Sequence, residues 1–166
     1  MSSLEKDKSY RGASSQFFVA GELCRRGYAA VVTLGNTPNT DVLCSNRDGT
    51  KFVHIQVKTF VPGSKTCSVG KKAERMYGSN FFWVLGGIPT PCSELPFRYY
   101  IVPSNEMASN VAARHHEWLS APGKKGQQRK DSSVRAVAVK EGAASYFWNV
   151  AEYEGRWDLI EDALRN

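Results

Sequence analysis

The 166-residue sequence lacks several features that would each define a class of protein. Its four cysteines lie far apart and form no CxxC pair, which argues against a zinc ribbon or a redox motif. It has no recognisable signal peptide and no apolar run long enough to span a membrane, so we expect a cytoplasmic protein with reduced thiols and no membrane partner. No internal repeat is evident. With 42% hydrophobic residues, this length suits one globular domain over residues 1–166.

Acidic residues are scarce in one stretch of the second half. Between Lys124 and Lys140 there are six basic residues and a single acid, Asp131. Together with the net charge of +6, this distribution is typical of a protein that contacts a polyanion. The alternative is that the basic runs are solvated loops, and residues 120–133 have the composition of a flexible basic loop. The candidate polyanion contacts are Lys71, Lys72, Lys124, Lys125, Arg129 and Lys130.

The pattern of residues 40–60 predicts a β-hairpin. Asp48 and Gly49 suit a two-residue hairpin turn, because both tolerate the positive φ values that match the twist of the strands. A turn centred on these two residues pairs Asp41 with Gln56. If the turn had three residues, the register would slip and Asp41 would lie on the opposite face.

The second strand of this hairpin has one polar face. Apolar and polar side chains alternate through residues 53–58, so Gln56 and Lys58 point to the same side of the sheet. The paired Asp41 joins them there. A carboxylate, a carboxamide and an ammonium group are therefore predicted to share one patch. Without further information, the same alternation also describes the solvent-facing side of an antiparallel strand.

Further helices and strands are predicted on both sides of the hairpin. A loose lead-in is expected up to about residue 11, followed by a helix over residues 16–27 with Ser14 or Ser15 as its N-cap and Gly27 as its C-terminal glycine. Ser104 is a candidate N-cap for a second helix. The remaining expected elements are strands at residues 28–34, 81–86, 97–103 and 134–139, and helices at residues 71–76, 105–119 and 157–165.

Several segments, in this order, resemble a known family. They are the helix QFFVAGELCRRGY, the strand start TDVL, the strand VHIQVKT and, more loosely, YYIVPS. With the spacing D-x14-QVK, they resemble the PD-(D/E)XK nuclease superfamily, which includes Holliday junction resolvases and some intron homing endonucleases. The resemblance covers about the first three fifths of the chain. It implies a restriction-endonuclease-like α/β fold, with a central mixed sheet flanked by helices.

The resemblance also implies a role for each residue of the patch. Asp41 would bind Mg²⁺, with Mn²⁺ as a substitute, and the main-chain carbonyl of Val57 and the side chain of Gln56 would add neutral ligands. Lys58 would hold or activate the attacking water. The first helix of the family supplies a further residue, usually glutamate, and its position falls here on Gln16. The implied substrate is DNA, and cutting both strands of a duplex implies a possible homodimer.

Glu22 is also acidic and lies on the same predicted helix. It precedes Arg26 by four residues, which is the spacing of an ion pair on a helix surface. We therefore interpret Glu22 as a surface residue and Gln16 as the family position.

Three functions are compatible with these patterns. The first is a metal-dependent endonuclease that hydrolyses phosphodiester bonds in DNA. The second is a DNA-binding module on the same fold whose catalysis has decayed, because Gln16 and Gln56 stand where the family has acidic residues. The third is an unrelated α/β domain that interacts with proteins.

Overall fold

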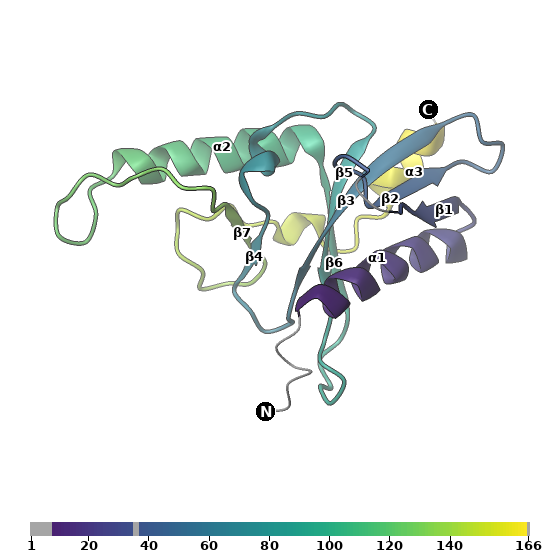
Figure 1. The fold of residues 1–166 in the computed structure, drawn as a ribbon, viewed down its shortest axis with the longest axis horizontal. Helices are drawn as coiled ribbons and strands as arrows, with labels where there is room; N and C mark the ends of the chain where they lie inside the picture. The colour runs from purple at the N-terminus through teal and green to yellow at the C-terminus, as the bar shows by residue number, and fades with distance from the viewer. Residues whose placement is uncertain (1–7, 35–36, 166) are drawn as a thin grey trace.

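The computed structural model describes residues 8–34 and 37–165 of the chain. These residues form three α-helices, two short 3-10 helices and seven strands (Figure 1). The elements in chain order are α1 (Lys8–Arg25), β1 (Ala29–Val32), β2 (Val42–Ser45), β3 (Phe52–Phe60), β4 (Thr66–Ser68), η2 (Lys71–Glu74), β5 (Phe81–Gly87), β6 (Arg98–Pro103), α2 (Ser104–Ser120), β7 (Ala136–Ala138), η3 (Ala151–Tyr153) and α3 (Asp158–Arg165).

Five of the strands form a central mixed sheet in the order β1-β2-β3-β5-β6. The central strands β3 and β5 are parallel, and the other neighbours in this sheet are antiparallel. A second sheet pairs β4 with β7. The predicted central mixed sheet flanked by helices is therefore confirmed.

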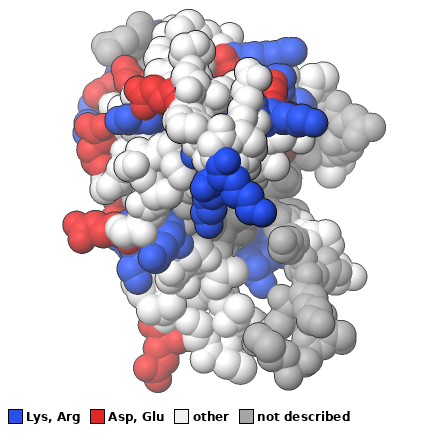
Figure 2. Space-filling model, turned by 90° about the vertical axis from the view of Figure 1, so that its left-hand side faces the viewer, with Lys and Arg blue, Asp and Glu red and all other residues white. Residues whose placement is uncertain are grey.

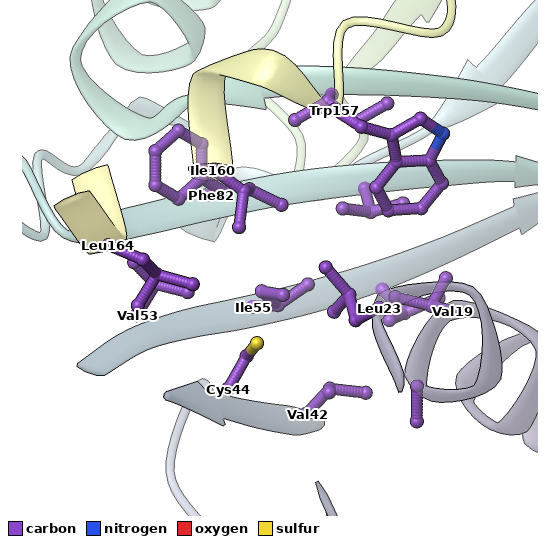
Figure 3. Close-up of a cluster of buried hydrophobic side chains, with 14 residues drawn as sticks. Val19, Leu23, Val42, Cys44, Val53, Ile55, Phe82, Trp157, Ile160 and Leu164 are labelled. Atoms are coloured by element: carbon purple, nitrogen blue, oxygen red, sulfur yellow. The ribbon is translucent and has the colours of Figure 1, made fainter. Parts of the chain in front are cut away.

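Helices cover both faces of the central sheet (Figure 1). On one face, α1 and α3 pack on apolar side chains of β2, β3 and β5, and Figure 3 shows Leu23, Ile55 and Ile160 in this cluster. On the other face, β4, η2, α2 and β7 enclose a second cluster that contains Trp83, Tyr100 and Met107. Burial of these apolar side chains is the main stabilising contribution to both layers.

Helix α1 begins at Lys8, so the prediction of a loose lead-in up to residue 11 is wrong over residues 8–11. Residues 1–7 lie outside the described part of the chain. The predicted N-cap is also wrong. The Ser14 hydroxyl donates to the Arg11 carbonyl one turn earlier, at 3.0 Å, and so bonds inside the helix. Ser15 is fully buried within α1.

The C-terminal end of α1 is as predicted. Gly27 has a φ of 94°, and its N–H donates to the Cys24 carbonyl at 2.9 Å. The N–H of Tyr28 donates to the Leu23 carbonyl at 3.2 Å. These two bonds make a Schellman motif, in which glycine takes the left-handed position at no steric cost. The turn brings the chain directly into β1.

A close contact between α1 and β5 fixes how the first helix lies on the sheet. A Cβ atom added at Gly86 would be 2.4 Å from the Ser15 hydroxyl oxygen. Only a glycine in β5 and a small residue in α1 allow this approach. The burial of Ser15 is therefore explained by packing and not by capping.

The hairpin has the predicted register but a longer turn. Val42 pairs with Ile55, and Ser45 pairs with Phe52. The same register, extended by one residue, places Asp41 opposite Gln56. The Asn46 N–H donates to the Lys51 carbonyl at 3.1 Å, so four residues close the hairpin in place of the expected two. The register is unchanged because this loop is centred on the same point. The three-residue alternative is also excluded.

Helix α2 begins at Ser104, with Pro103 in the N-cap position and no side-chain cap. The predicted N-cap role of Ser104 is therefore wrong. Its buried hydroxyl instead accepts a hydrogen bond from the Tyr77 N–H at 2.8 Å. This bond ties the start of α2 to the segment between η2 and β5. The Ser104 hydroxyl oxygen thus accepts from the distant Tyr77 N–H, and not from an N–H in the first turn of α2.

The remaining predicted elements lie within a few residues of their predicted positions, whereas β4 and η3 were not predicted. The helix expected at residues 71–76 is the shorter 3-10 helix η2, and the strand expected at residues 134–139 is limited to β7. All four cysteines are free. In the described part of the chain, no helix combines the length and the apolar character that crossing a membrane requires.

Candidate active site

Asp41 lies at the start of β2, where the chain enters the central sheet. Its N–H donates to the Ile55 carbonyl of β3 at 2.8 Å, and its carbonyl accepts from the Thr33 N–H at 3.0 Å. The Thr33 hydroxyl also donates to the Thr40 carbonyl at 2.6 Å. The backbone on both sides of Asp41 is therefore held by β1 and β3, and a side chain on such a backbone is well positioned.

The Asp41 carboxylate contacts two of the residues that the sequence pattern predicted. Its Oδ2 atom accepts a short hydrogen bond from the side-chain amide of Gln56. The same oxygen accepts from the Val57 N–H at 2.7 Å. The N–H and the carbonyl of one strand residue lie on the same edge of the strand, so the Val57 carbonyl also lies on the edge toward β2. Asp41, Gln56 and the Val57 main chain thus meet at the seam between β2 and β3.

Lys58 lies on the same face of the sheet. Its Nζ is 6.0 Å from the centre of the Trp83 ring, and Trp83 belongs to the cluster on the α2 side. Burial raises the pKa of the Cys67 thiol in β4 to about 12, and the positive charge of Lys58 opposes part of that shift. Lys58 is half-buried between these neighbours. The prediction that Asp41, Gln56 and Lys58 share one face is confirmed.

Gln16 is not joined to this group. It is half-buried on α1, and its neighbours Ser15 and Val19 pack on the opposite face of the sheet. Within residues 8–34 and 37–165, no hydrogen bond links Gln16 to Asp41, Gln56 or Lys58. Its role therefore stays a prediction from the resemblance.

Glu22 has the predicted surface role. It pairs with Arg26 at 2.8 Å and also with Arg25 at 2.7 Å. The hydrogen bond from Arg25, with a smaller contribution from Arg26, lowers the pKa of the Glu22 carboxyl. The predicted interpretation of Glu22 as an ion-paired residue of the helix surface is therefore confirmed.

The donors at the seam suit one hard divalent cation that is bound weakly. Asp41 provides one anionic carboxylate and the Val57 carbonyl a neutral oxygen, both of which suit Mg²⁺; Gln56 turns its amide nitrogen to Asp41 in this structure and would add an oxygen only after its amide rotates. In the part of the chain that the structure describes, no three His, Cys, Asp or Glu side chains are grouped so that they could hold a metal ion. With a single anionic ligand, the site would need the charge of a bound phosphate to complete it.

Two of the predicted basic contacts are engaged with the protein. Lys71 pairs with Asp131 at 3.1 Å. The Arg129 guanidinium lies 4.8 Å from the centre of the Trp118 ring and donates to the Trp118 carbonyl at 2.9 Å. The side chains of Lys72, Lys124, Lys125 and Lys130 are exposed. Figure 2 shows Lys and Arg on one face in separate groups, interspersed with Asp and Glu.

A buried ion network anchors the basic segment that follows α2. Arg135 is 4% exposed, forms a short ion pair with Glu74 of η2, and pairs with Asp131 at 3.1 Å. Asp131 also contacts His115 of α2 at 2.9 Å. Hydrogen bonds, first from Lys71 and then from His115 and Arg135, hold the pKa of Asp131 well below its usual range. The single acid of the basic run is therefore the residue that ties it to the fold.

Sequence reasoning missed His54 as a residue of the site. Its Nδ1 lies 3.1 Å from the hydroxyl oxygen of Thr40, the residue that precedes Asp41. The alternation in β3 placed His54 on the same face as Gln56, which was the one available signal. No pattern in the sequence identifies Thr40 as its partner.

The described fold is similar to that of a solved bacterial homing endonuclease. The chain is similar to the bacterial homing endonuclease I-Ssp6803I, with a TM-score of 0.53 over 96% of this chain and 95% of that chain, at 14% sequence identity. It also matches Archaeoglobus fulgidus Hjc, a Holliday junction resolvase from an archaeal hyperthermophile, with a TM-score of 0.44 over 86% and 93% of the two chains, at 14% identity.

No family model and no curated protein matches the sequence. At this low identity, the first structural similarity defines the fold and does not define the catalytic residues. It confirms the fold class that the sequence resemblance implied, a central mixed sheet flanked by helices.

Proposed function

We propose that this protein is a metal-dependent endonuclease that hydrolyses phosphodiester bonds in DNA. One observation supports the proposal more than any other. On a nuclease fold, the Asp41 carboxylate meets Gln56 and the Val57 main chain at the seam of β2 and β3, with Lys58 on the same face. A carboxylate beside neutral oxygens and an ammonium group is a set suited to phosphodiester chemistry.

Asp41, the Val57 carbonyl and the Gln56 amide oxygen would hold the metal. Mg²⁺, when bound, lowers the pKa of a coordinated water and polarises the phosphate oxygens. The Gln56 amide nitrogen donates to Asp41 in this structure, so Gln56 would present its oxygen only after its amide group rotates. Until then this bond holds the carboxylate in a fixed orientation.

Lys58 would act on the substrate phosphate and on the attacking water. Its ammonium group carries three donors and a positive charge, which stabilise the charge that develops on the phosphoryl oxygens. The packing of Lys58 near Trp83 and Cys67 limits the positions of its side chain. A fixed donor stabilises a transition state better than a freely moving one.

A DNA-binding module without catalysis is the second candidate. The observation in its favour is that, among the residues the structure describes, Asp41 is the one carboxylate hydrogen-bonded to Gln56 and the Val57 main chain. With neutral side chains at positions 16 and 56, affinity for a free metal ion should be low. The exposed lysines of the basic segment would suffice for binding that depends on salt.

A cleavage assay separates the two candidates. Purified protein is incubated with supercoiled plasmid, single-stranded DNA and branched DNA, with Mg²⁺, Mn²⁺ or a chelator. The endonuclease proposal predicts cutting that requires the metal and is lost in Asp41→Asn, a variant that keeps the shape of the side chain. Clear binding of intact DNA under every metal condition would support the binding module. If the protein neither binds nor cuts DNA, both candidates are contradicted.

A further inference from the structure

An open groove lies beside the candidate active site. Its volume is about 400 Å³, and it is lined by the segment that leads into β2 and by residues at the start of β3 and β5. The residues that line it include Thr33, Asn39, Thr40, His54, Tyr77 and Asn80. The volume falls within the range of about 300–1,000 Å³ that is common for ligand sites.

The groove is continuous with the site through two residues. Thr40 directly precedes Asp41 in the chain, and His54 lies two residues before Gln56, on the same face of β3. The two side chains contact each other at 3.1 Å. The main-chain N–H of His54 donates to the main-chain carbonyl of Asn80 at 2.8 Å, and this bond links β3 to the segment before β5. A molecule that crosses the Asp41 carboxylate on this face would therefore run into the groove.

The chemistry of the groove suits the backbone of a nucleic acid strand. Hydroxyl, amide and imidazole groups line it beside the apolar side chains of Pro38, Leu43 and Phe81, and none of its lining residues is Lys, Arg, Asp or Glu. Neutral side chains of these types make many of the contacts that proteins form with phosphates and sugars. When the Thr40 hydroxyl donates to Nδ1 of a neutral His54, the imidazole proton is on Nε2, which can then donate to a ligand.

Tyr77 forms an aromatic wall of the groove. Its ring stacks on Phe81 with 4.5 Å between the ring centres, and its backbone is held by Ser104. Its hydroxyl is buried and has no hydrogen-bond partner within the described chain. A rigid ring in a groove that also carries hydrogen-bonding groups provides a surface for a sugar or a base.

We propose that this groove binds the nucleotide next to the scissile phosphate, on the strand that the Asp41 site would cut, with His54 donating to its phosphate. The inference rests on the proposed function. It adds that the flanking nucleotide is held by neutral hydrogen-bonding groups, whereas the exposed lysines of the basic segment act through charge. The two contributions should therefore differ in their dependence on salt.

Fluorescence anisotropy with a labelled DNA duplex tests the inference. The full chain is titrated in Ca²⁺ at several salt concentrations as wild type, His54→Ala, His54→Gln and His116→Ala. His116 is exposed on α2, so it is a matched control for loss of an imidazole. We expect His54→Ala to weaken binding about 10-fold at every salt concentration, because a hydrogen bond to a charged phosphate is lost. The slope of affinity against salt should not change, His54→Gln should recover part of the loss, and His116→Ala should bind as wild type.

The outcomes separate this inference from the proposed function. If the wild type cuts DNA with Mg²⁺ and His54→Ala binds and cuts equally well, the groove is not a nucleotide site, although the nuclease proposal stands. If the wild type binds but never cuts, and His54→Ala still lowers affinity without changing the salt slope, the groove inference stands and the nuclease proposal fails. Equal weakening by His116→Ala would overturn the groove inference. Thermal melting of each variant shows whether the loss of the Thr40 contact has changed the fold.

Discussion

Sequence patterns predicted two regions of this molecule, the seam between β2 and β3 and the basic segment after α2. The two regions differ in how well the pattern predicts the contacts that the structure shows. At the seam, Asp41, Gln56 and Lys58 lie on one face as predicted. In the basic segment, Arg129 is engaged with Trp118, and Asp131 of the segment pairs with Lys71 of η2. Alternation in a strand defines a direction for each side chain, whereas a run of charges defines no partner for any of them.

This difference has a physical cause. A strand has a period of two, so a register error would bury polar groups, and only one pairing satisfies the apolar face. A long basic side chain can reach several partners at similar free energy, and surface ion pairs contribute little individually. Buried ion pairs are the exception, and Arg135 is of that kind. Predictions that separate the two regions follow, from the largest expected effect to the smallest.

Loss of the buried arginine should have the largest effect on stability. Arg135→Ala leaves Glu74 without its partner; because the Glu74 side chain is 21% exposed and can be hydrated, we expect a loss of about 2 kcal/mol, less than for a fully buried pair. Chemical denaturation measures the change in the free energy of unfolding. Lys124→Ala removes an exposed charge of the same segment and should be nearly neutral. A loss below about 1 kcal/mol for Arg135→Ala would show that the network does not anchor the segment.

A second acid at the seam should create a stronger metal site. Gln56→Glu replaces the donor to Asp41 with a like charge, so the variant should be less stable than wild type without metal. Mg²⁺ should then raise its melting temperature more than it raises that of the wild type, since a metal at 100 times its Kd stabilises by about 2.7 kcal/mol. In Gln56→Glu combined with Asp41→Asn, this response should be smaller. An equal Mg²⁺ response in wild type and Gln56→Glu would place the metal elsewhere.

Exposed and paired lysines should differ in DNA binding. Lys124→Ala and Lys125→Ala should each lower the slope of log affinity against log salt by roughly 1, because each removes one phosphate contact. Lys71→Ala should lower it less, because Lys71 already pairs with Asp131. Anisotropy titrations at several salt concentrations give these slopes. Equal effects of all three variants would mean that the Asp131 pair opens when DNA binds.

The stabilisation from Asp131 should depend on pH. The folded protein holds the pKa of this carboxyl below its ordinary value, so its contribution to stability is complete above the unfolded pKa of about 3.9 and is lost as the pH falls toward the folded pKa. Asp131→Asn should therefore be slightly less stable than wild type at pH 7 and equal to it in strong acid. Thermal melting across this pH range measures the difference. A constant difference at all pH values would assign the effect of the variant to packing.

The fold and the main part of the site could be predicted because they depend on local patterns. The Gly27 turn, the apolar strand at residues 81–86 and the pairing of Asp41 with Gln56 each follow from a few neighbouring residues. The errors arose where a distant residue determines the structure. Ser15 packs on Gly86, and Ser104 accepts from the Tyr77 backbone, so neither serine caps a helix. Contacts between residues so far apart in the chain leave no periodic signal in the sequence.

The central claim is that Asp41 and Lys58 act together on one phosphodiester bond. The most direct test is the single-turnover rate of DNA cleavage in Mn²⁺ by wild type, Lys58→Met and Lys72→Met, measured at saturating protein so that a weaker phosphate contact of the exposed Lys72 does not lower the rate. The account predicts a loss of at least about 100-fold for Lys58→Met, as expected for a group that stabilises transition-state charge, and little change for Lys72→Met. If Lys58→Met cleaves DNA at the same rate as the wild type, the central claim is contradicted.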